Sequence, residues 1–202
     1  MNINKIKKMI CLAETKFLSL YDAEYENKKG KRKHWIIASR KNNEVLKSCY
    51  FDYKPDYTDA VVVAALHEAS GSLVVIRQFR VPLNDYVYEL PAGLIDSGED
   101  IKYALNRELQ EETGLKVTWV NEKLSSQKTY LSSGMTDESA AFIYCRCEGT
   151  ITKDYLEEDE DIEAFLVSQE EAEVLVDSGA KMDIKAFIIL NSFAKLGKDL
   201  FA

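Results

Sequence analysis

The stretch that most restricts the fold of this chain is GLIDSGEDIKYALNRELQEETGL, residues 93–115. Apolar residues recur in it at helical spacing from about residue 99 to residue 113, which predicts an amphipathic helix. Ser97 is a suitable N-cap and Gly114 a suitable C-cap for such a helix. One side of this segment must therefore pack against the rest of the fold.

Acidic residues lie on the side of this helix that should be buried. On a helical wheel, Glu108 and Glu112 fall inside the apolar stripe and Glu111 lies at its edge, whereas a simple charged surface would lie opposite the leucines. A buried carboxylate must be protonated, paired or bound to a cation. Carboxylate oxygens suit Mg2+ or Mn2+, so the spacing predicts a divalent metal site. Arg107 is placed to pair with Glu111 one turn later.

The remaining pattern predicts two parts of the chain. Residues 1–55 contain strands joined by turns and should form a small antiparallel β unit, and residues 56–202 should form a domain with a mixed sheet and helices. The acidic connection at 153–163 is expected to be a solvated loop. In the first part, strands are expected at 11–25, 34–40 and 45–51. In the second, strands are expected at 60–68, 73–81, 85–90, 115–125, 139–147 and 162–168, and further helices at 169–179 and 182–197.

Charge and hydropathy exclude several classes of function. The chain has 26 basic and 34 acidic residues, a net charge of -8, which disfavours a broad grip on nucleic acid or anionic lipid. The apolar stretch near the N-terminus is shorter than a secretory signal, and no run approaches the ~20 residues of a membrane span. We therefore expect a cytoplasmic protein with no nucleic-acid or membrane partner. The cysteines show no C-x-x-C pair and are expected to be buried free thiols, with zinc or a disulfide as the alternatives: Cys11, Cys49, Cys145 and Cys147.

The helical stretch resembles the Nudix box, G-x5-E-x7-R-E-U-x-E-E-x-G-U, where U is a bulky aliphatic residue. This resemblance implies an α/β/α sandwich with a mixed sheet, here preceded by the small antiparallel β unit. It also implies Mg2+-dependent hydrolysis of a nucleoside diphosphate linked to another group, with Mn2+ as a possible substitute. Every fixed position of the box is filled, by Gly93, Glu99, Arg107, Glu108, Leu109, Glu111, Glu112, Gly114 and Leu115.

The resemblance assigns roles around the box. Glu108 and Glu112 would hold the metal, together with the main-chain carbonyl of Ala92. The stretch SSGMTDE, residues 132–138, resembles a loop that supplies a further glutamate for the metal and for catalysis, here Glu138. The remaining catalytic roles would belong to Glu111 and Arg107.

Flanking residues resemble the ADP-ribose and ADP-sugar pyrophosphatases of this family, in GKRKHWIIASR, RQFR and YELPAGLIDSGE. The products would be AMP and a sugar phosphate. In that group the leading β unit builds a homodimer and lends residues to the partner's site. The resemblance implies that Trp35 stacks on adenine, that Arg40 holds the nucleotide, that Arg80 contacts the diphosphate or ribose, that Glu89 lines the base pocket, and that Leu94 contacts the substrate.

Three alternatives remain open at this point. One is a housekeeping role on oxidised nucleoside triphosphates, although such proteins are generally shorter and lack the leading β unit. ADP-ribose enzymes often carry a proline where this chain has Ser133, so a UDP- or GDP-sugar could be the substrate instead. A non-catalytic nucleotide-sugar sensor is the third alternative, although sensors usually have a degraded box. Without the resemblance, Trp35 reads as core packing and Arg40 and Arg80 as surface cations. His34 and His67 show no ligand spacing and receive no role.

Overall fold

The computed structural model describes residues 5–156, 158 and 160–202. These residues form two compact units. The first unit contains the chain up to Asp59 together with Lys128–Ala140, and the second contains Ala60–Gln127 and Ala141–Ala202. Within the described residues, no helix has the length and apolar character that a membrane span requires.

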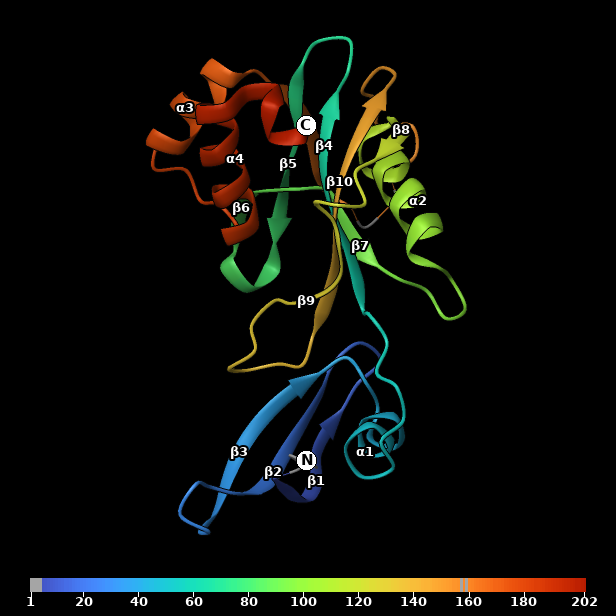
Figure 1. Ribbon diagram of the computed structural model, residues 1–202, viewed down its shortest axis with the longest axis vertical. Coiled ribbons are helices and arrows are strands. Elements are labelled where there is room, and N and C mark those ends of the chain that lie inside the picture. Colours follow the sequence, from blue (N-terminus) through green and yellow to red (C-terminus); the bar gives the residue numbers. More distant parts are fainter. Residues whose placement is uncertain (1–4, 157, 159) are drawn as a thin grey trace. The chain divides into compact units, whose positions relative to one another are not determined.

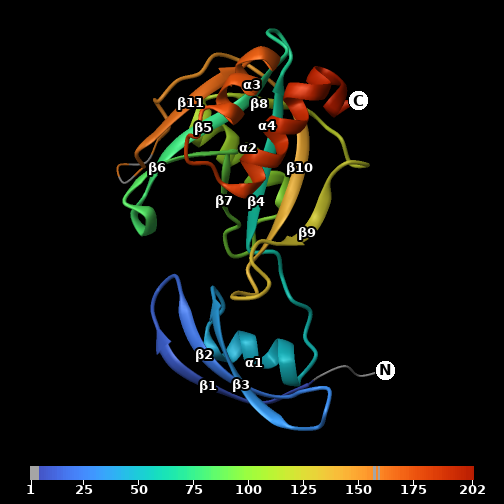
Figure 2. The same cartoon turned by 90° about the vertical axis from the view of Figure 1, so that its left-hand side faces the viewer.

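The first unit is built on a three-stranded antiparallel sheet of β1 (Ile6–Glu14), β2 (Ser19–Glu26) and β3 (Arg32–Ser39), in that order. One face of the sheet is covered by α1 (Asn43–Phe51), as Figure 2 shows. Met9, Tyr21 and Leu46 form the core between the helix and the sheet. Burial of these side chains fixes which face of the sheet is closed.

The helix α1 occupies residues that the sequence pattern assigned to a strand, so the prediction for residues 45–51 was wrong. Asn42 caps the helix, since its side-chain oxygen accepts a hydrogen bond of 3.0 Å from the amide of Val45. Leu46 is the buried residue of the helix. A helix of nine residues gains little from propensity alone, and its packing on the sheet decides its structure.

The second unit contains most of an eight-stranded mixed sheet with the path β11-β5-β4-β10-β8. Off this path, β6 pairs with β5, β7 with β4 and β9 with β10. The short strands β7 and β9 were not expected from the sequence. The strands are β4 (Ala60–His67), β5 (Ser72–Arg80), β6 (Asp85–Glu89), β7 (Ala92–Leu94), β8 (Lys116–Val120), β9 (Ser126–Tyr130), β10 (Ser139–Glu148) and β11 (Ile162–Val167).

Helices lie on both sides of this sheet in the second unit. Figure 1 shows α2 (Ile101–Thr113) on one side and α3 (Gln169–Asp177) with α4 (Ile184–Leu196) on the other. The strand β4 is buried along its whole length, as expected of a strand covered on both faces. This arrangement confirms the α/β/α sandwich. Short 3-10 helices occupy Val81–Leu83 and Gly197–Phe201.

The box helix α2 has the predicted C-terminus but a different start. Gly114 adopts φ 78° and its amide bonds to the carbonyl of Gln110, as a left-handed C-cap does. Asp100, not Ser97, is the N-cap, because its side chain accepts a 2.7 Å hydrogen bond from the amide of Tyr103. The helix therefore begins at Ile101, and Glu99 lies before it.

Candidate active site

The strand β7 brings main-chain atoms against the two inward-facing acids of α2. The amide of Ala92 donates a 3.0 Å hydrogen bond to Oε2 of Glu112. At Gly93, a Cβ atom would lie 2.0 Å from Cδ of Glu108, closer than any real contact. Glycine lets the strand pass without displacing the end of the Glu108 side chain. Pairing of Gly93 with Val61 of β4 holds the strand in place.

Burial changes the electrostatics of both acids, as the wheel predicted. Glu108 is 6% exposed and Glu112 is 4% exposed. Burial raises the pKa of Glu108 to about 7, against the opposing charge of Arg107. Burial also raises the pKa of Glu112 well above its usual range, and the charge of Glu108 adds to the effect. Two buried carboxylates four residues apart thus repel each other and favour a proton or a cation.

A single guanidinium holds the other acids of the box. Arg107 donates to Oε2 of Glu111 at 2.9 Å and forms a 2.8 Å ion pair with Glu108. Two further bonds of 2.8 Å and 3.0 Å reach both carboxylate oxygens of Glu99, and Arg107 lowers the pKa of that carboxyl. A 2.9 Å bond to the carbonyl of Leu94 completes the set. The Arg107–Glu111 pair is confirmed, and Glu99 is a further partner of Arg107.

The donor set of this region suits a divalent ion. The described residues contain no group of three or more histidine, cysteine, aspartate or glutamate side chains arranged to hold a metal. Glu108 and Glu112 nevertheless offer two buried carboxylates, and Gly93 leaves the space that the Glu108 carboxylate occupies. Mg2+ commonly binds through one or two carboxylates, keeps several waters and uses substrate phosphates for the rest. The residues present therefore fit the implied metal, with Ala92 supplying main-chain atoms at the same place.

Arg80 and Glu89 form a pair on the neighbouring strands β5 and β6. The guanidinium of Arg80 donates two bonds, of 2.6 Å and 2.7 Å, to the two oxygens of the Glu89 carboxylate. Glu89 is 7% exposed, so this forked pair fixes the arginine. The charge of Arg80 also favours the ionised form of Glu112. Arg80 thus presents positive charge near the acids of α2.

The other predicted substrate residues form a group within the first unit. The indole of Trp35 donates a 3.1 Å hydrogen bond to the carbonyl of Gly134, and its side chain is half exposed. Arg40 donates from Nε to the carboxylate of Glu138. A pocket of ≈ 290 Å³ lies beside Trp35, and it is lined by Trp35, Ile37, Tyr50, Tyr130 and residues 133–137.

The structure thus brings the predicted residues together as two groups, one in each compact unit. Their combination into one site stays a prediction. The first group contains Trp35, Arg40 and Glu138, and the second contains Arg80, Glu89, Ala92, Leu94, Arg107, Glu108, Glu111 and Glu112.

One acid near the site was missed by the sequence reading. The charge of Glu160 raises the pKa of both Glu108 and Glu112, which places it among the charges that act on these acids. The sequence predicts a solvated loop at residues 153–163, of which residues 157 and 159 lie outside the described residues. The sequence signal that could have identified Glu160 is its position, because it lies just before the strand β11. A main-chain bond of 3.2 Å from Phe79 to Asp161 ties this point to β5.

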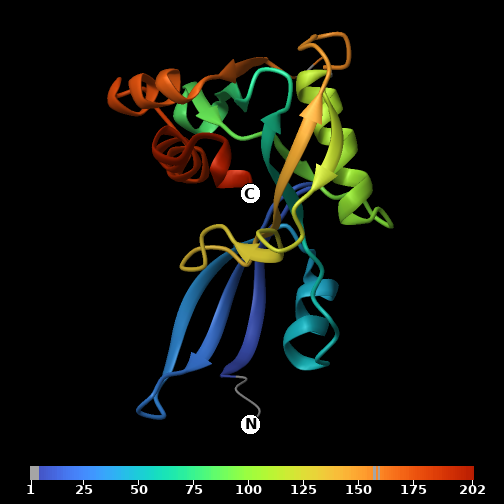
Figure 3. The same ribbon diagram turned by 45° about the horizontal axis from the view of Figure 1, so that its top comes forward.

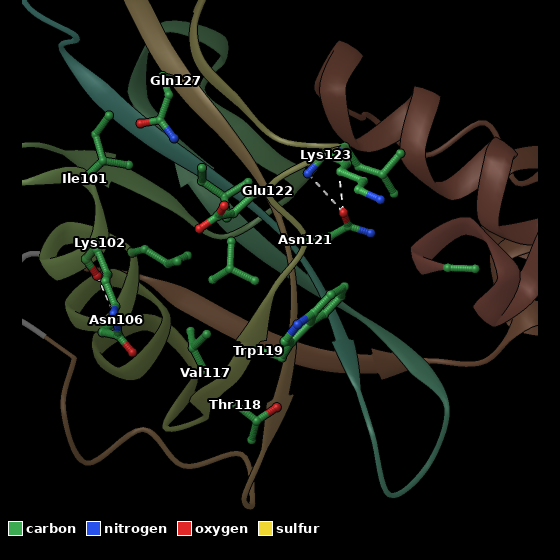
Figure 4. Close-up of a pocket in the computed structure, with 15 residues that line it drawn as sticks. Ile101, Lys102, Asn106, Val117, Thr118, Trp119, Asn121, Glu122, Lys123 and Gln127 are labelled. Atoms are coloured by element: carbon green, nitrogen blue, oxygen red, sulfur yellow. Dashed lines mark hydrogen bonds between the residues drawn. The ribbon is translucent and has the colours of Figure 1, made fainter.

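A wider hollow of ≈ 990 Å³ lies beside α2 and β8 (Figure 4). Lys102 and Asn106 of α2 and Trp119 of β8 are among its lining residues. Among the residues described by the structure, those that line it include none of the predicted site residues. Size alone therefore does not mark the active site here.

Comparisons with known proteins agree with this geometry. The family model described as NUDIX domain matches residues 56–187. A Caenorhabditis elegans protein whose name includes "nudix hydrolase 2" is 36% identical over 120 residues, 55% of this chain and 52% of that protein. The ADP-ribose pyrophosphatase of Bacillus subtilis (strain 168) is 36% identical over 128 residues, 62% of this chain and 66% of that protein. The chain thus spans about half and about two thirds of these relatives.

A solved structure described as that of an ADP compounds hydrolase has a similar fold. The match has a TM-score of 0.64 at 16% sequence identity and covers 94% of this chain and 93% of that chain. At this identity the match bears on the fold alone. It covers both the antiparallel leading sheet and the larger mixed sheet.

Proposed function

Because the chain belongs to the Nudix hydrolase family, we propose that it hydrolyses the diphosphate linkage of ADP-ribose or a related ADP-sugar. The products are AMP and a sugar phosphate, the metal is Mg2+, and the enzyme works in the cytoplasm. The observation that carries the proposal is the buried pair of Glu108 and Glu112 against the backbone of β7. The name of the Bacillus subtilis relative, an ADP-ribose pyrophosphatase, supports the choice of substrate.

In this proposal the box holds the metal and fixes its own acids. Glu108 and Glu112 supply carboxylate ligands, with the carbonyl of Ala92, and Arg107 keeps Glu111 and Glu108 in place. When bound, a divalent ion neutralises charge that develops on the phosphate oxygens. Arg80, fixed by Glu89, adds a positive contact for the diphosphate.

The reaction itself needs an acceptor for one proton of water. The water oxygen attacks one phosphorus, the bridging P–O bond breaks, and the bridging oxygen leaves with AMP or with the sugar phosphate. Glu138 is the proposed acceptor and positions the water.

The base of the substrate is proposed to stack on Trp35. The indole is fixed by its bond to Gly134, and the adjoining pocket is lined by Tyr50 and Tyr130. Stacking of a base on an aromatic side chain contributes about 1–3 kcal/mol. Replacing Trp35 by Ala should therefore raise KM for an ADP-sugar roughly tenfold while kcat changes less. An unchanged KM would remove the stacking role.

A panel of substrates tests the whole proposal. The purified protein is incubated with ADP-ribose, ADP-glucose, UDP-glucose and GDP-mannose in Mg2+ and water labelled with oxygen-18. We expect the highest kcat/KM for an ADP-sugar, and the label identifies the phosphorus attacked. Preference for a UDP- or GDP-sugar would support the alternative substrate, and no turnover of any member would contradict the proposal.

A homodimer is proposed from the open face of the first unit's sheet. Ile10 and Ile36 both flank Asp22 in register, on the face opposite Tyr21 and α1, and both are at least 43% exposed. Leu20 adds apolar surface on the same face. Contiguous exposed apolar surface marks interaction sites. Light scattering should give twice the monomer mass, and a monomer at working concentration would contradict the dimer.

A further inference from the structure

Lys41 is a buried lysine that the proposed mechanism does not use. It follows β3, is 1% exposed, and its Nζ contacts three carboxylates. The distances are 3.2 Å to Asp56, 3.0 Å to Asp59 and 3.2 Å to Asp137. Burial opposes the charged form, but these acids outweigh it and raise the pKa of Lys41, so the lysine is charged. All these residues belong to the first unit.

The residues before and after Glu138 in the chain both bind to this cluster. Asp137, the residue before it, is paired with Lys41. Ser139, the residue after it, donates from its amide and its hydroxyl to Oδ2 of Asp59, both at 2.9 Å, and Asp59 is itself bonded to Lys41. The carboxylate of Glu138 pairs with Arg40, the neighbour of Lys41. Two consecutive basic residues therefore meet two consecutive acidic residues.

The same contacts hold the loop that carries the Trp35 pocket. The amide of Ala38 at the end of β3 bonds to the carbonyl of Met135 at 3.0 Å, and Ala38 forms a parallel bridge with Thr136. Figure 3 shows the chain after β9 in this unit. Residues 133–137 form one wall of the pocket beside Trp35. A shift of Asp137 would therefore change the position of Glu138 and of the loop wall beside Trp35.

Stability alone does not account for a buried ion pair such as that of Lys41 and Asp59. A well-packed apolar replacement of a buried ion pair is often as stable or more stable, whereas removing one partner leaves costly unpaired charge. Without Lys41, the cluster would keep three carboxylates. Asp59 is anchored to Ser139 by main-chain and side-chain bonds. Oδ1 of Asp137 already has no hydrogen-bond partner in the described part of the chain, so Asp137 is the group that would move.

We propose that Lys41 is a positioning residue for the hydrolysis. It sets the place of Glu138 through Asp137 on one side and through Asp59 and Ser139 on the other, and it fixes the loop wall beside Trp35. The catalytic part of this inference rests on the proposed function.

Kinetics provide the first test. Lys41→Met removes the charge at similar volume, and Lys128→Met is the matched control, since Lys128 bonds Asp56 and the carbonyl of Tyr57 in the same cluster. Small misplacement of a catalytic group can cost up to roughly 100-fold in rate. We expect kcat for the ADP-sugar to fall at least about tenfold in Lys41→Met and to change less than about twofold in the control. Equal kcat values for Lys41→Met and wild type would overturn the proposal.

Fluorescence provides a second test that needs no substrate. The chain has two tryptophans, so Trp119→Phe leaves Trp35 as the single reporter, bonded to the loop through Gly134. In this background, Lys41→Met should raise quenching of Trp35 by acrylamide, while far-ultraviolet circular dichroism shows a folded chain. An unchanged quenching constant in a folded variant would overturn the role of Lys41 in holding the loop.

The two tests separate the failure of this inference from that of the proposed function. If wild-type protein hydrolyses no nucleotide sugar, the proposed function is wrong. Acrylamide quenching of Trp35 fluorescence still tests whether Lys41 holds the loop. If Lys41→Met does not fold, Asp137→Asn takes its place, since it removes the partner's charge at the same size. Increased quenching and a lower kcat in Asp137→Asn would support the inference, and wild-type values of both would overturn it.

Discussion

Two clusters of acids in this molecule, one around the buried Lys41 and one on the buried face of α2, are neutralised in different ways. In the first unit, Asp56, Asp59 and Asp137 surround the ammonium of Lys41. In the second unit, Glu108 and Glu112 lie on one face of α2, and the pKa of each is raised. Arg107 pairs with Glu108 there, but the hydrogen bond described for Glu112 comes from a main-chain amide.

The two clusters differ in whether the chain itself supplies enough positive charge for its acids. Where the chain supplies the cation, the pKa of that cation is raised and each of the three carboxylates contacts it in the folded state. Where the acids exceed the cations, the folded chain retains unfavourable charge that a proton or a metal ion can relieve. The three predictions that follow test this difference, from the largest expected effect to the smallest.

Glu112→Gln should produce the largest effect, a loss of kcat of roughly 10³-fold, because a metal clamp contributes several kcal/mol to the transition state. The same change should raise the unfolding temperature in buffer of neutral pH without divalent ions, since burial and the nearby Glu108 disfavour the ionised form of Glu112 and glutamine cannot ionise. Steady-state kinetics and thermal scans with and without Mg2+ measure both. Near-normal kcat, or a lower unfolding temperature without metal, would contradict the ligand role.

Stability of the metal-free protein should depend on pH through Glu108. Its folded pKa of about 7 lies above the ordinary value of 4.5, so the folded state binds more protons than the unfolded state between these values. The free energy of unfolding should therefore be highest below about pH 4.5 for this group and fall as pH rises through 7, by on the order of 3 kcal/mol.

Chemical unfolding in a chelator at a series of pH values measures this slope. Glu108→Gln is the matched control, because residue 108 cannot then titrate, and it should reduce the slope over this range to the part that Glu112 contributes. Mg2+ should also flatten the curve in the wild type, since the metal competes with the proton. A slope that is the same in wild type and Glu108→Gln would contradict the assignment.

Gly93→Ala should have the smallest of the three effects. The new Cβ would meet the carboxylate of Glu108 at 2.0 Å, and the flexible end of that side chain must move. Overpacking of this kind costs about 1–3 kcal/mol, so we expect kcat to fall roughly tenfold with a modest loss of stability. Wild-type kcat in Gly93→Ala would show that this clearance is unimportant.

Much of the second unit could be predicted from sequence because its signals are local. The spacing of acids and apolar residues predicted which side chains of α2 are buried, and Glu108 and Glu112 are. Gly114 marked the end of the helix correctly. The start was misplaced because Ser97 and Asp100 are both good caps, and only the path of the preceding loop decides between them.

The parts that could not be predicted depend on contacts between distant residues. Residues 45–51 carry aromatic and apolar side chains that suit a strand, but packing of Leu46 against Tyr21 made them a helix. The partners of Lys41 lie as far along the chain as Asp137, so its neighbours in sequence gave no sign of burial. Glu160 lies in an acidic run and could not be distinguished from its neighbours by sequence. Its effect, a raised pKa of Glu108, arises only in the folded chain.

The contacts of Arg107 have a kinetic consequence. Because one guanidinium joins Glu99 and Leu94 of the preceding segment to Glu108 and Glu111 of the helix, these acids keep their spacing before any ion arrives. Divalent ions should therefore enter and leave without rearrangement of the chain. Loss of water from the incoming Mg2+, which dehydrates reluctantly, would then set the rate of loading.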